Sequence, residues 1–260
     1  MLKFDMKKTK KIEIFLLLLY WFLISALALI LKFRYLEMAI FFSGVPAAYL
    51  LIRNHKYSSK IPIRSFLFMI PAIIVFEIFG HISRAWYESS IFSFRVFGIF
   101  PLESFLWGIN YFILTVSFYE YFFDRPNKPQ RNPIFLKILI LAYIGMTLTL
   151  AFLIFVPSLL SVPYFYTLFL VLILLLTILV SIKCPKIFKK ALPVSLIGLL
   201  PALLHEFVSL ELGHWSFEKG YHLAYIEILN HTLPIEELIW LPLLPIWIVL
   251  FYEFTMDDFK

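Results

Sequence analysis

Residues 101–124 read PLESFLWGINYFILTVSFYEYFFD, and residues 234–257 read PIEELIWLPLLPIWIVLFYEFTMD. Aligned at a constant offset of 133 without a gap, the two stretches are identical at nine of 24 positions. Rare residue types are among the matches, such as Trp107 with Trp240. Each stretch is long and apolar enough to cross a lipid bilayer as a helix. The pair therefore predicts a chain of two homologous halves, each ending in a membrane-spanning helix.

The composition limits the class of protein. Of 260 residues, 62% are apolar and only 15% are charged, which leaves too little polar material to cover a water-soluble protein. In lipid the backbone must satisfy its own hydrogen bonds, and long unbroken apolar runs favour helices over a barrel. We therefore predict an all-α, polytopic transmembrane bundle of about eight helices. The spans are predicted at residues 12–31, 35–52, 65–83, 102–122, 134–156, 164–182, 191–208 and 234–254.

A second shared spacing lies upstream of the first. Glu77 precedes Trp86 by nine residues, and Glu206 precedes Trp215 by nine. An even number of predicted spans separates the copies, so the two halves have the same orientation. We predict two parallel four-helix repeats, comprising residues 1–131 and residues 132–260.

Lysine and arginine are distributed unequally between the two sides of the predicted bundle. Eighteen of the 23 cationic residues fall on the side of the amino terminus, and excess positive charge marks the cytoplasmic side. The others are Lys32, Arg34, Arg84, Arg95 and Lys219. Both termini are therefore predicted to be cytoplasmic, with the protein in the cell membrane. The net charge of +6 reflects this topology and predicts no nucleic-acid partner.

Glutamates inside or at the outer ends of spans are the candidate functional residues, because charge at the centre of a bilayer costs roughly 2.5–3.5 kcal/mol on insertion scales. They are Glu77, Glu103, Glu206, Glu236 and Glu237. Where two carboxyl groups share a low dielectric, one tends to keep its proton and can act as a general acid. For Glu103 a structural role at the helix N-terminus is an open alternative. Pro101, Pro234, Tyr119 and Tyr252 are explained by helix initiation, packing or anchoring at the membrane interface.

These residues resemble the membrane-type lycopene cyclases of microbial carotenoid pathways. The resemblance rests on PIEELIW at 234–240, its weaker copy PLESFLW at 101–107, and GHWSF at 213–217. In that family a proline–glutamate–glutamate motif begins a transmembrane helix in each of two homologous halves. The first copy here departs from the pattern, since Ser104 stands where a second acid is expected.

The resemblance implies a fused two-domain enzyme that converts the linear end of lycopene, or a related carotene, into a β-ring within the lipid bilayer. It implies an isomerase of the lycopene β-cyclase type, with no cofactor and no metal. Glu236 and Glu237 would share the acid and base roles, and Glu103 would assist from the other half. The substrate pocket would contain Glu77, Glu206 and four tryptophans, Trp86, Trp107, Trp215 and Trp240. The indole rings of the tryptophans can stabilise a cation.

Three other functions remain open at this point. A diverged relative could hydrate the carotenoid end group, or could bind or transport carotenoids without reaction. The third is an intramembrane metalloprotease with ligands among Glu236, Glu237, His205, Glu206, His214 and His231. The sequence also leaves open the ring type, a homo-oligomeric state, and whether the loops at 84–100 and 209–233 form lids.

Overall fold

The computed structural model describes residues 8–54, 60–124 and 133–256. The chain is mostly helical, at 76%. The helices of the first half are α1 (Lys8–Leu31), α2 (Tyr35–Met38), the π-helix η1 (Ala39–Gly44), α3 (Val45–Arg53), α4 (Lys60–Ile82) and α5 (Glu103–Phe122). Those of the second half are α6 (Pro133–Phe155), the 3-10 helix η2 (Pro157–Leu160), α7 (Phe165–Lys183), α8 (Pro185–Glu211) and α9 (Ile235–Thr255).

Seven helical segments in the described ranges are long and apolar enough to cross a membrane, with α2, η1 and α3 forming one of them. The predicted spans match the helices to within a few residues at most ends, and α8 begins six residues earlier than expected. The remaining predicted span, residues 102–122, corresponds to α5, which is less apolar than the other seven. Thirteen of its 20 residues are buried, so protein rather than lipid surrounds it, and polar side chains such as Asn110 find partners there.

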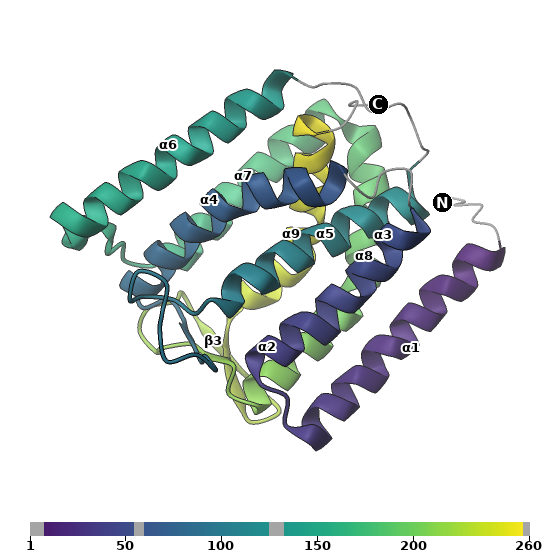
Figure 1. The fold of residues 1–260 in the computed structure, drawn as a ribbon, viewed down its shortest axis with the longest axis horizontal. Coiled ribbons are helices and arrows are strands. Elements are labelled where there is room, and N and C mark those ends of the chain that lie inside the picture. Colours follow the sequence, from purple (N-terminus) through teal and green to yellow (C-terminus); the bar gives the residue numbers. More distant parts are fainter. Residues whose placement is uncertain (1–7, 55–59, 125–132, 257–260) are drawn as a thin grey trace.

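The two halves pack reciprocally. The first helix of each half lies against the third helix of the other half, α1 on α8 and α6 on α4. In Figure 1, α1 and α6 lie at opposite edges, and α5 and α9 lie in the middle. The largest cluster of buried apolar side chains joins α1, α5, α8 and α9. Each half therefore needs helices of the other half to cover its buried apolar side chains.

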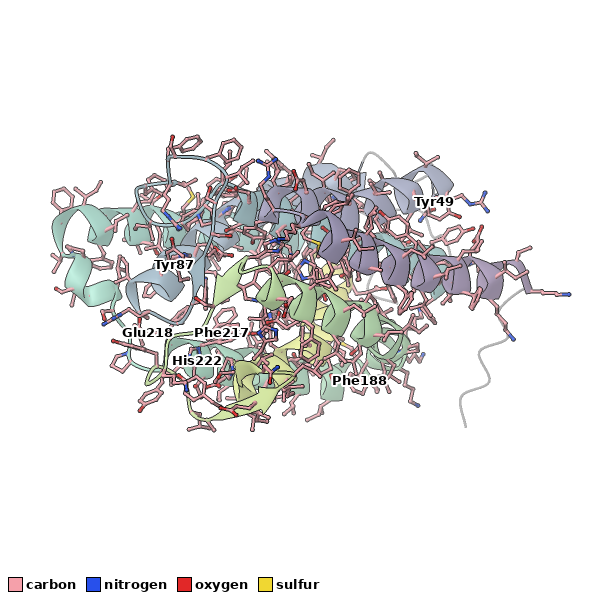
Figure 2. All side chains as sticks on the ribbon, turned by 90° about the horizontal axis from the view of Figure 1, so that it is seen from below. Tyr49, Tyr87, Phe188, Phe217, Glu218 and His222 are labelled. Carbon is pink, nitrogen blue, oxygen red and sulfur yellow. The ribbon has the colours of Figure 1, made fainter. Side chains whose placement is uncertain are left out.

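Two short antiparallel ribbons, which the prediction of an all-α bundle did not include, lie outside the helices. Strand β1 (Tyr87–Glu88) pairs with β2 (Trp215–Ser216), and β3 (Tyr225–Ile228) pairs with β4 (His231–Pro234). The first ribbon joins the loop of one half to the loop of the other, because Glu88 pairs with Trp215. Figure 2 shows Tyr87, Phe217 and His222 gathered at this end of the bundle, away from Tyr49. Backbone pairing across the two loops satisfies polar groups that no helix can satisfy.

Two reciprocal hydrogen bonds join the carboxyl-terminal ends of α5 and α9, away from the ribbons. Tyr119 donates its hydroxyl proton to Glu253, and Tyr252 donates to Glu120 at 2.7 Å. Both tyrosines are buried, so the interpretation of Tyr119 and Tyr252 as interfacial anchors is wrong. They fasten the last helix of each half to that of the other.

We expect Tyr119→Phe and Tyr252→Phe each to lower the apparent melting temperature of the detergent-solubilised protein. Each change removes a donor from a buried carboxyl, at a cost of about 1–3 kcal/mol. The two variants should lose similar amounts, because their contacts are copies. Exposed Tyr49 supplies the control, and a Tyr49→Phe protein that loses as much stability would contradict the assignment.

The boundary predicted at residues 131 and 132 lies outside the described residues. So do seven of the cationic residues that defined the predicted topology, and one acid of the repeat. They are Lys3, Lys7, Lys56, Arg125, Lys128, Arg131, Lys260 and Asp257.

Candidate functional site

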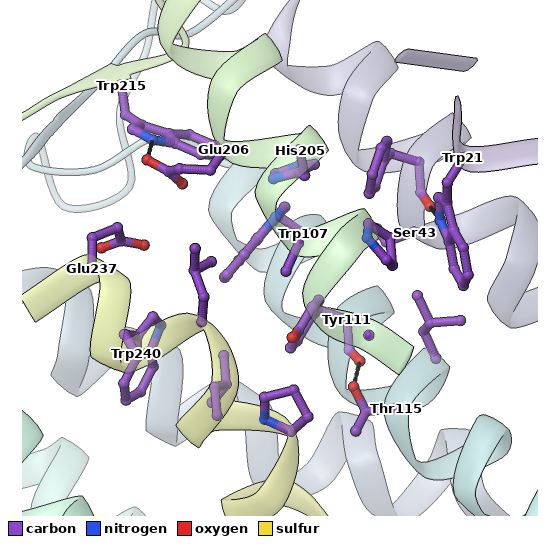
Figure 3. Close-up of a pocket in the computed structure, with 18 of the residues that line it drawn as sticks. Trp21, Ser43, Trp107, Tyr111, Thr115, His205, Glu206, Trp215, Glu237 and Trp240 are labelled. Carbon is purple, nitrogen blue, oxygen red and sulfur yellow. Dashed lines mark hydrogen bonds between the residues drawn. The ribbon is translucent and has the colours of Figure 1, made fainter. Parts of the chain in front are cut away.

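A largely apolar cavity lies between the two halves and has a volume of about 170 Å³. A single water requires only about 10–15 Å³ by this measure, so the cavity can hold an organic group. Helices α1, α4 and α5 of the first half line it together with α7, α8 and α9 of the second. Figure 3 shows Trp107, Glu206, Glu237 and Trp240 around it. The loop that follows α4 and the loop that follows α8, called the outer loops below, also contribute to its wall, through Glu88 and Phe217.

All four predicted tryptophans line this cavity. They are Trp86, Trp107, Trp215 and Trp240. Trp240 stacks on Phe76, with ring centroids 6.1 Å apart and an interplanar angle of 14°. Trp107 lies 6.2 Å from His205, which is offset from Phe76 by 129 residues. The tryptophan in the last helix of each half therefore meets the third helix of the other half.

Two of the glutamates are paired with tryptophans in the same way. The Trp86 indole N–H donates to Glu77 at 3.2 Å, and the Trp215 indole N–H donates to Glu206 at 3.0 Å. Both glutamates line the cavity and are buried. Each glutamate lies near the carboxyl-terminal end of its helix, α4 or α8. The nine-residue spacing lets the loop that follows fold back, so that its indole N–H reaches the carboxyl group.

The adjacent pair Glu236 and Glu237 does not share one site. Consecutive residues on a helix project about 100° apart, and the two carboxyl groups have different partners. Glu237 lines the cavity and accepts a hydrogen bond from the Tyr166 hydroxyl of α7. Glu236 is not among the described residues around the cavity; it accepts from the Leu223 backbone N–H at 2.8 Å and from the Thr167 hydroxyl.

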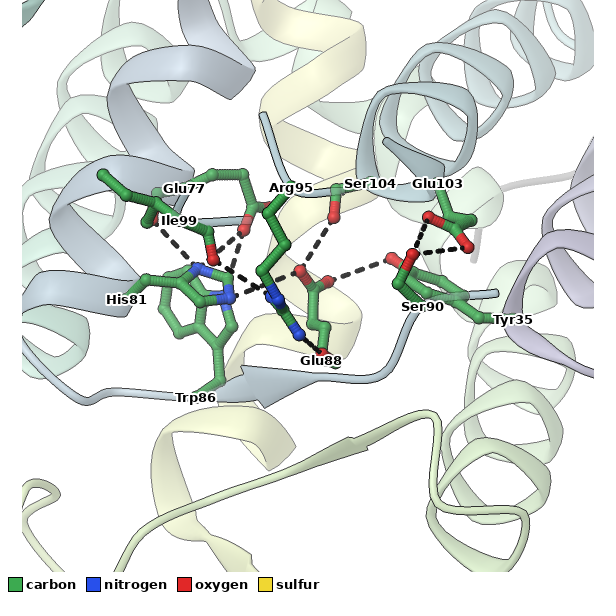
Figure 4. A network of polar contacts seen from close by, with 10 residues as sticks. All are labelled: Tyr35, Glu77, His81, Trp86, Glu88, Ser90, Arg95, Ile99, Glu103 and Ser104. Atoms are coloured by element: carbon green, nitrogen blue, oxygen red, sulfur yellow. Dashed lines mark hydrogen bonds and ion pairs between the residues drawn. The ribbon is translucent and has the colours of Figure 1, made fainter. Parts of the chain in front are cut away.

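Glu103 has the same role as Glu236. Its carboxylate accepts the Ile91 backbone N–H at 2.8 Å and the Ser90 hydroxyl at 3.1 and 3.0 Å (Figure 4). Both glutamates stand in the first turn of their helix and hold the loop that precedes it. Among the described residues around the cavity Glu103 does not appear, which favours its structural interpretation.

Glu88 is a cavity residue that the sequence reasoning missed. Its carboxyl oxygens accept the Tyr35 hydroxyl at 3.0 Å and the Ser104 hydroxyl at 2.7 Å (Figure 4). Burial, together with the nearby Glu77 carboxylate, raises the pKa of the Glu88 carboxyl to about 8. The group therefore keeps its proton at neutral pH. The repeat gave no signal for it, because Phe217 stands at the equivalent place in the second half.

The residues suggested for a metalloprotease do not converge. His214 Nε2 lies 2.7 Å from the Phe33 carbonyl oxygen, and His231 bonds exposed Glu211. Within the described part of the chain, the grouping of at least three ligand-type side chains is Glu77, His81 and Glu88, with atoms within 4.8 Å of one another. In this group Trp86 donates to Glu77 Oε2, and the hydroxyl groups of Tyr35 and Ser104 donate to the two carboxyl oxygens of Glu88.

Gly80 provides the space for the Trp86 indole. A Cβ atom at Gly80 would lie 2.0 Å from a ring atom of Trp86. We expect Gly80→Ala to displace the indole from Glu77 and to destabilise the protein by about 1–3 kcal/mol, as overpacking does. Gly145→Ala is the matched control, because no described atom lies within 4 Å of its added Cβ. Thermal unfolding in detergent checks both, and equal stability of the two variants would contradict the close packing.

Comparison of the chain with models of protein families, with curated proteins and with solved structures finds no match.

Proposed function

We propose that the protein is an integral membrane enzyme that cyclises the linear end of lycopene or a related carotene to a β-ring, without a cofactor. One observation carries the proposal: the buried carboxyl of Glu237 faces an apolar cavity lined by aromatic rings. A carotenoid end group is a hydrocarbon, so it requires an apolar cavity. Its conversion requires one proton donor and one proton acceptor, and no redox change.

The membrane part of the proposal rests on the seven long apolar helices of the described ranges. The proposed orientation, with both termini cytoplasmic, rests on the excess of lysine and arginine on their side. The division into two repeats, residues 1–131 and 132–260, is supported by the reciprocal packing of the halves and by the paired Glu–Trp contacts.

The reaction begins with transfer of a proton to the terminal double bond, which gives a tertiary cation. The internal double bond attacks this cation and forms the ring, and loss of a ring proton restores neutrality. Glu237 takes part in proton transfer, since it is the glutamate of the adjacent pair that lines the cavity. The faces of Trp107 and Trp240 stabilise the cation. Glu77 and Glu206 hold the indoles of Trp86 and Trp215 in the wall.

Expression in a lycopene-accumulating bacterial host tests the proposal. Pigments extracted from the membranes are separated by chromatography and compared with those of cells carrying an empty vector. We expect γ-carotene or β-carotene to appear. A hydroxylated end group would instead identify a hydratase, and unchanged lycopene in cells with well-inserted protein would overturn the proposal.

A further inference from the structure

The two halves differ at the position that follows the first glutamate of the motif. The second half has Glu237, and the first half has Ser104 at the offset of 133. The Ser104 hydroxyl donates to the Glu88 carboxyl at 2.7 Å. The carboxyl group of Glu88, from the outer loop, therefore lies within hydrogen-bond distance of Ser104, the position at which the first half has no glutamate.

The tyrosines that bind the two carboxyl groups are equivalent. Tyr35 begins α2 and donates to Glu88, and Tyr166, near the start of α7, donates to Glu237. Each is buried, and each sits edge-on against the tryptophan in the outer loop of the other half. Tyr35 lies 5.8 Å from Trp215 at 77°, and Tyr166 lies 5.6 Å from Trp86 at 73°. Glu88 thus occupies the environment in the first half that Glu237 occupies in the second.

We propose that Glu88 is the second proton-transfer residue of the cavity, the counterpart in the first half of Glu237. This inference rests on the proposed function and supplies a group that the reaction needs. The protonated member of the pair gives its proton to the terminal double bond, and the ionised member takes the proton that leaves the ring. No net proton is gained or lost, and exchange of one proton between the two carboxyl groups resets them.

The hydrogen-bond partners of Glu88 suit a group that gains and loses a proton. The hydroxyl groups of Tyr35 and Ser104 donate to a carboxylate and can turn to accept from a carboxylic acid. Glu237 has such a partner in Tyr166. The indole N–H groups that bond Glu77 and Glu206 can only donate. Hydroxyl partners therefore distinguish Glu88 and Glu237 from the other two carboxyl groups of the described cavity wall.

Moving the carboxyl group back to the helix tests the inference. We expect Glu88→Gln and Glu88→Ser each to reduce ring formation by about 100-fold or more, within the range of general acid–base catalysis. The exchange variant, with Glu88→Ser and Ser104→Glu together, should recover at least about tenfold over Glu88→Ser, because it restores a carboxyl group to the cavity. Glu218→Gln, an exposed acid of the outer loop paired with Arg84, is the control and should keep full activity.

The outcomes separate this inference from the proposed function. Each variant is compared at equal amounts of monodisperse protein in detergent. If Glu88→Gln keeps its activity while the separate variant Glu237→Gln loses it, the inference is overturned and the proposed function stands. A folded exchange variant no more active than Glu88→Ser gives Glu88 a structural role and also overturns it. A wild-type protein that forms no ring overturns both.

Discussion

Glu237→Gln is expected to reduce ring formation by about 10²- to 10⁴-fold, the range that a positioned general acid or base contributes. The amide keeps the size of the side chain and can still bond to the Tyr166 hydroxyl. It cannot give or take a proton in the reaction. Pigment chromatography of membranes with equal protein content measures the effect.

Glu236→Gln is the matched comparison for this prediction. Glu236 is adjacent in sequence, yet it bonds the Leu223 N–H and the Thr167 hydroxyl instead of facing the cavity. Loss of the Glu236 carboxylate should lower the stability of the protein, and should have a smaller effect on turnover per folded molecule. If Glu236→Gln abolished ring formation while Glu237→Gln left it intact, the assignment of the cavity carboxyl would be wrong.

Trp240→Leu is expected to slow ring formation by roughly 30-fold. A desolvated cation–π contact is worth about 2 kcal/mol, and each 1.36 kcal/mol in the barrier is tenfold in rate. Leucine keeps an apolar wall and removes the ring face that stabilises the cation. Trp240→Phe should lose less, because it keeps a ring. Rates in reconstituted vesicles at saturating substrate measure the effect.

The control for Trp240 lies on the same helix. Trp247 packs against Phe251 and is outside the described cavity wall. Trp247→Leu should therefore leave the rate per folded molecule unchanged. A Trp240→Leu protein as active as the wild type would remove the indole from the mechanism.

Much of the fold could be predicted from sequence, because lipid restricts a chain to few structures. The spans follow from apolar runs, and the repeat of 101–124 at 234–257 predicts that the helices come in two sets. The sequence did not predict the ribbon between Tyr87–Glu88 and Trp215–Ser216. Strands of two residues carry no periodic pattern, and this ribbon joins loops more than 120 residues apart.

The candidate site was predictable where its geometry is local. The spacing from Glu77 to Trp86 and from Glu206 to Trp215 lies within one helix end and its loop, and both pairs meet. Glu88 was missed because it has no copy in the repeat. The different surroundings of Glu236 and Glu237 could have been inferred from helix geometry alone, since residues i and i+1 do not face each other.

The reciprocal packing of α1 on α8 and α6 on α4 has a consequence for how such a chain can evolve. Two identical subunits related by a twofold axis could make the same set of contacts, but in a homodimer every substitution appears twice. Covalent linkage of the halves removes that constraint. His205 can then face Trp107 while Phe76 faces Trp240. The cavity carboxyl group can likewise lie on the helix in one half, at Glu237, and on the loop in the other, at Glu88. The linked chain is thus free to treat the two sides of one cavity as different sites.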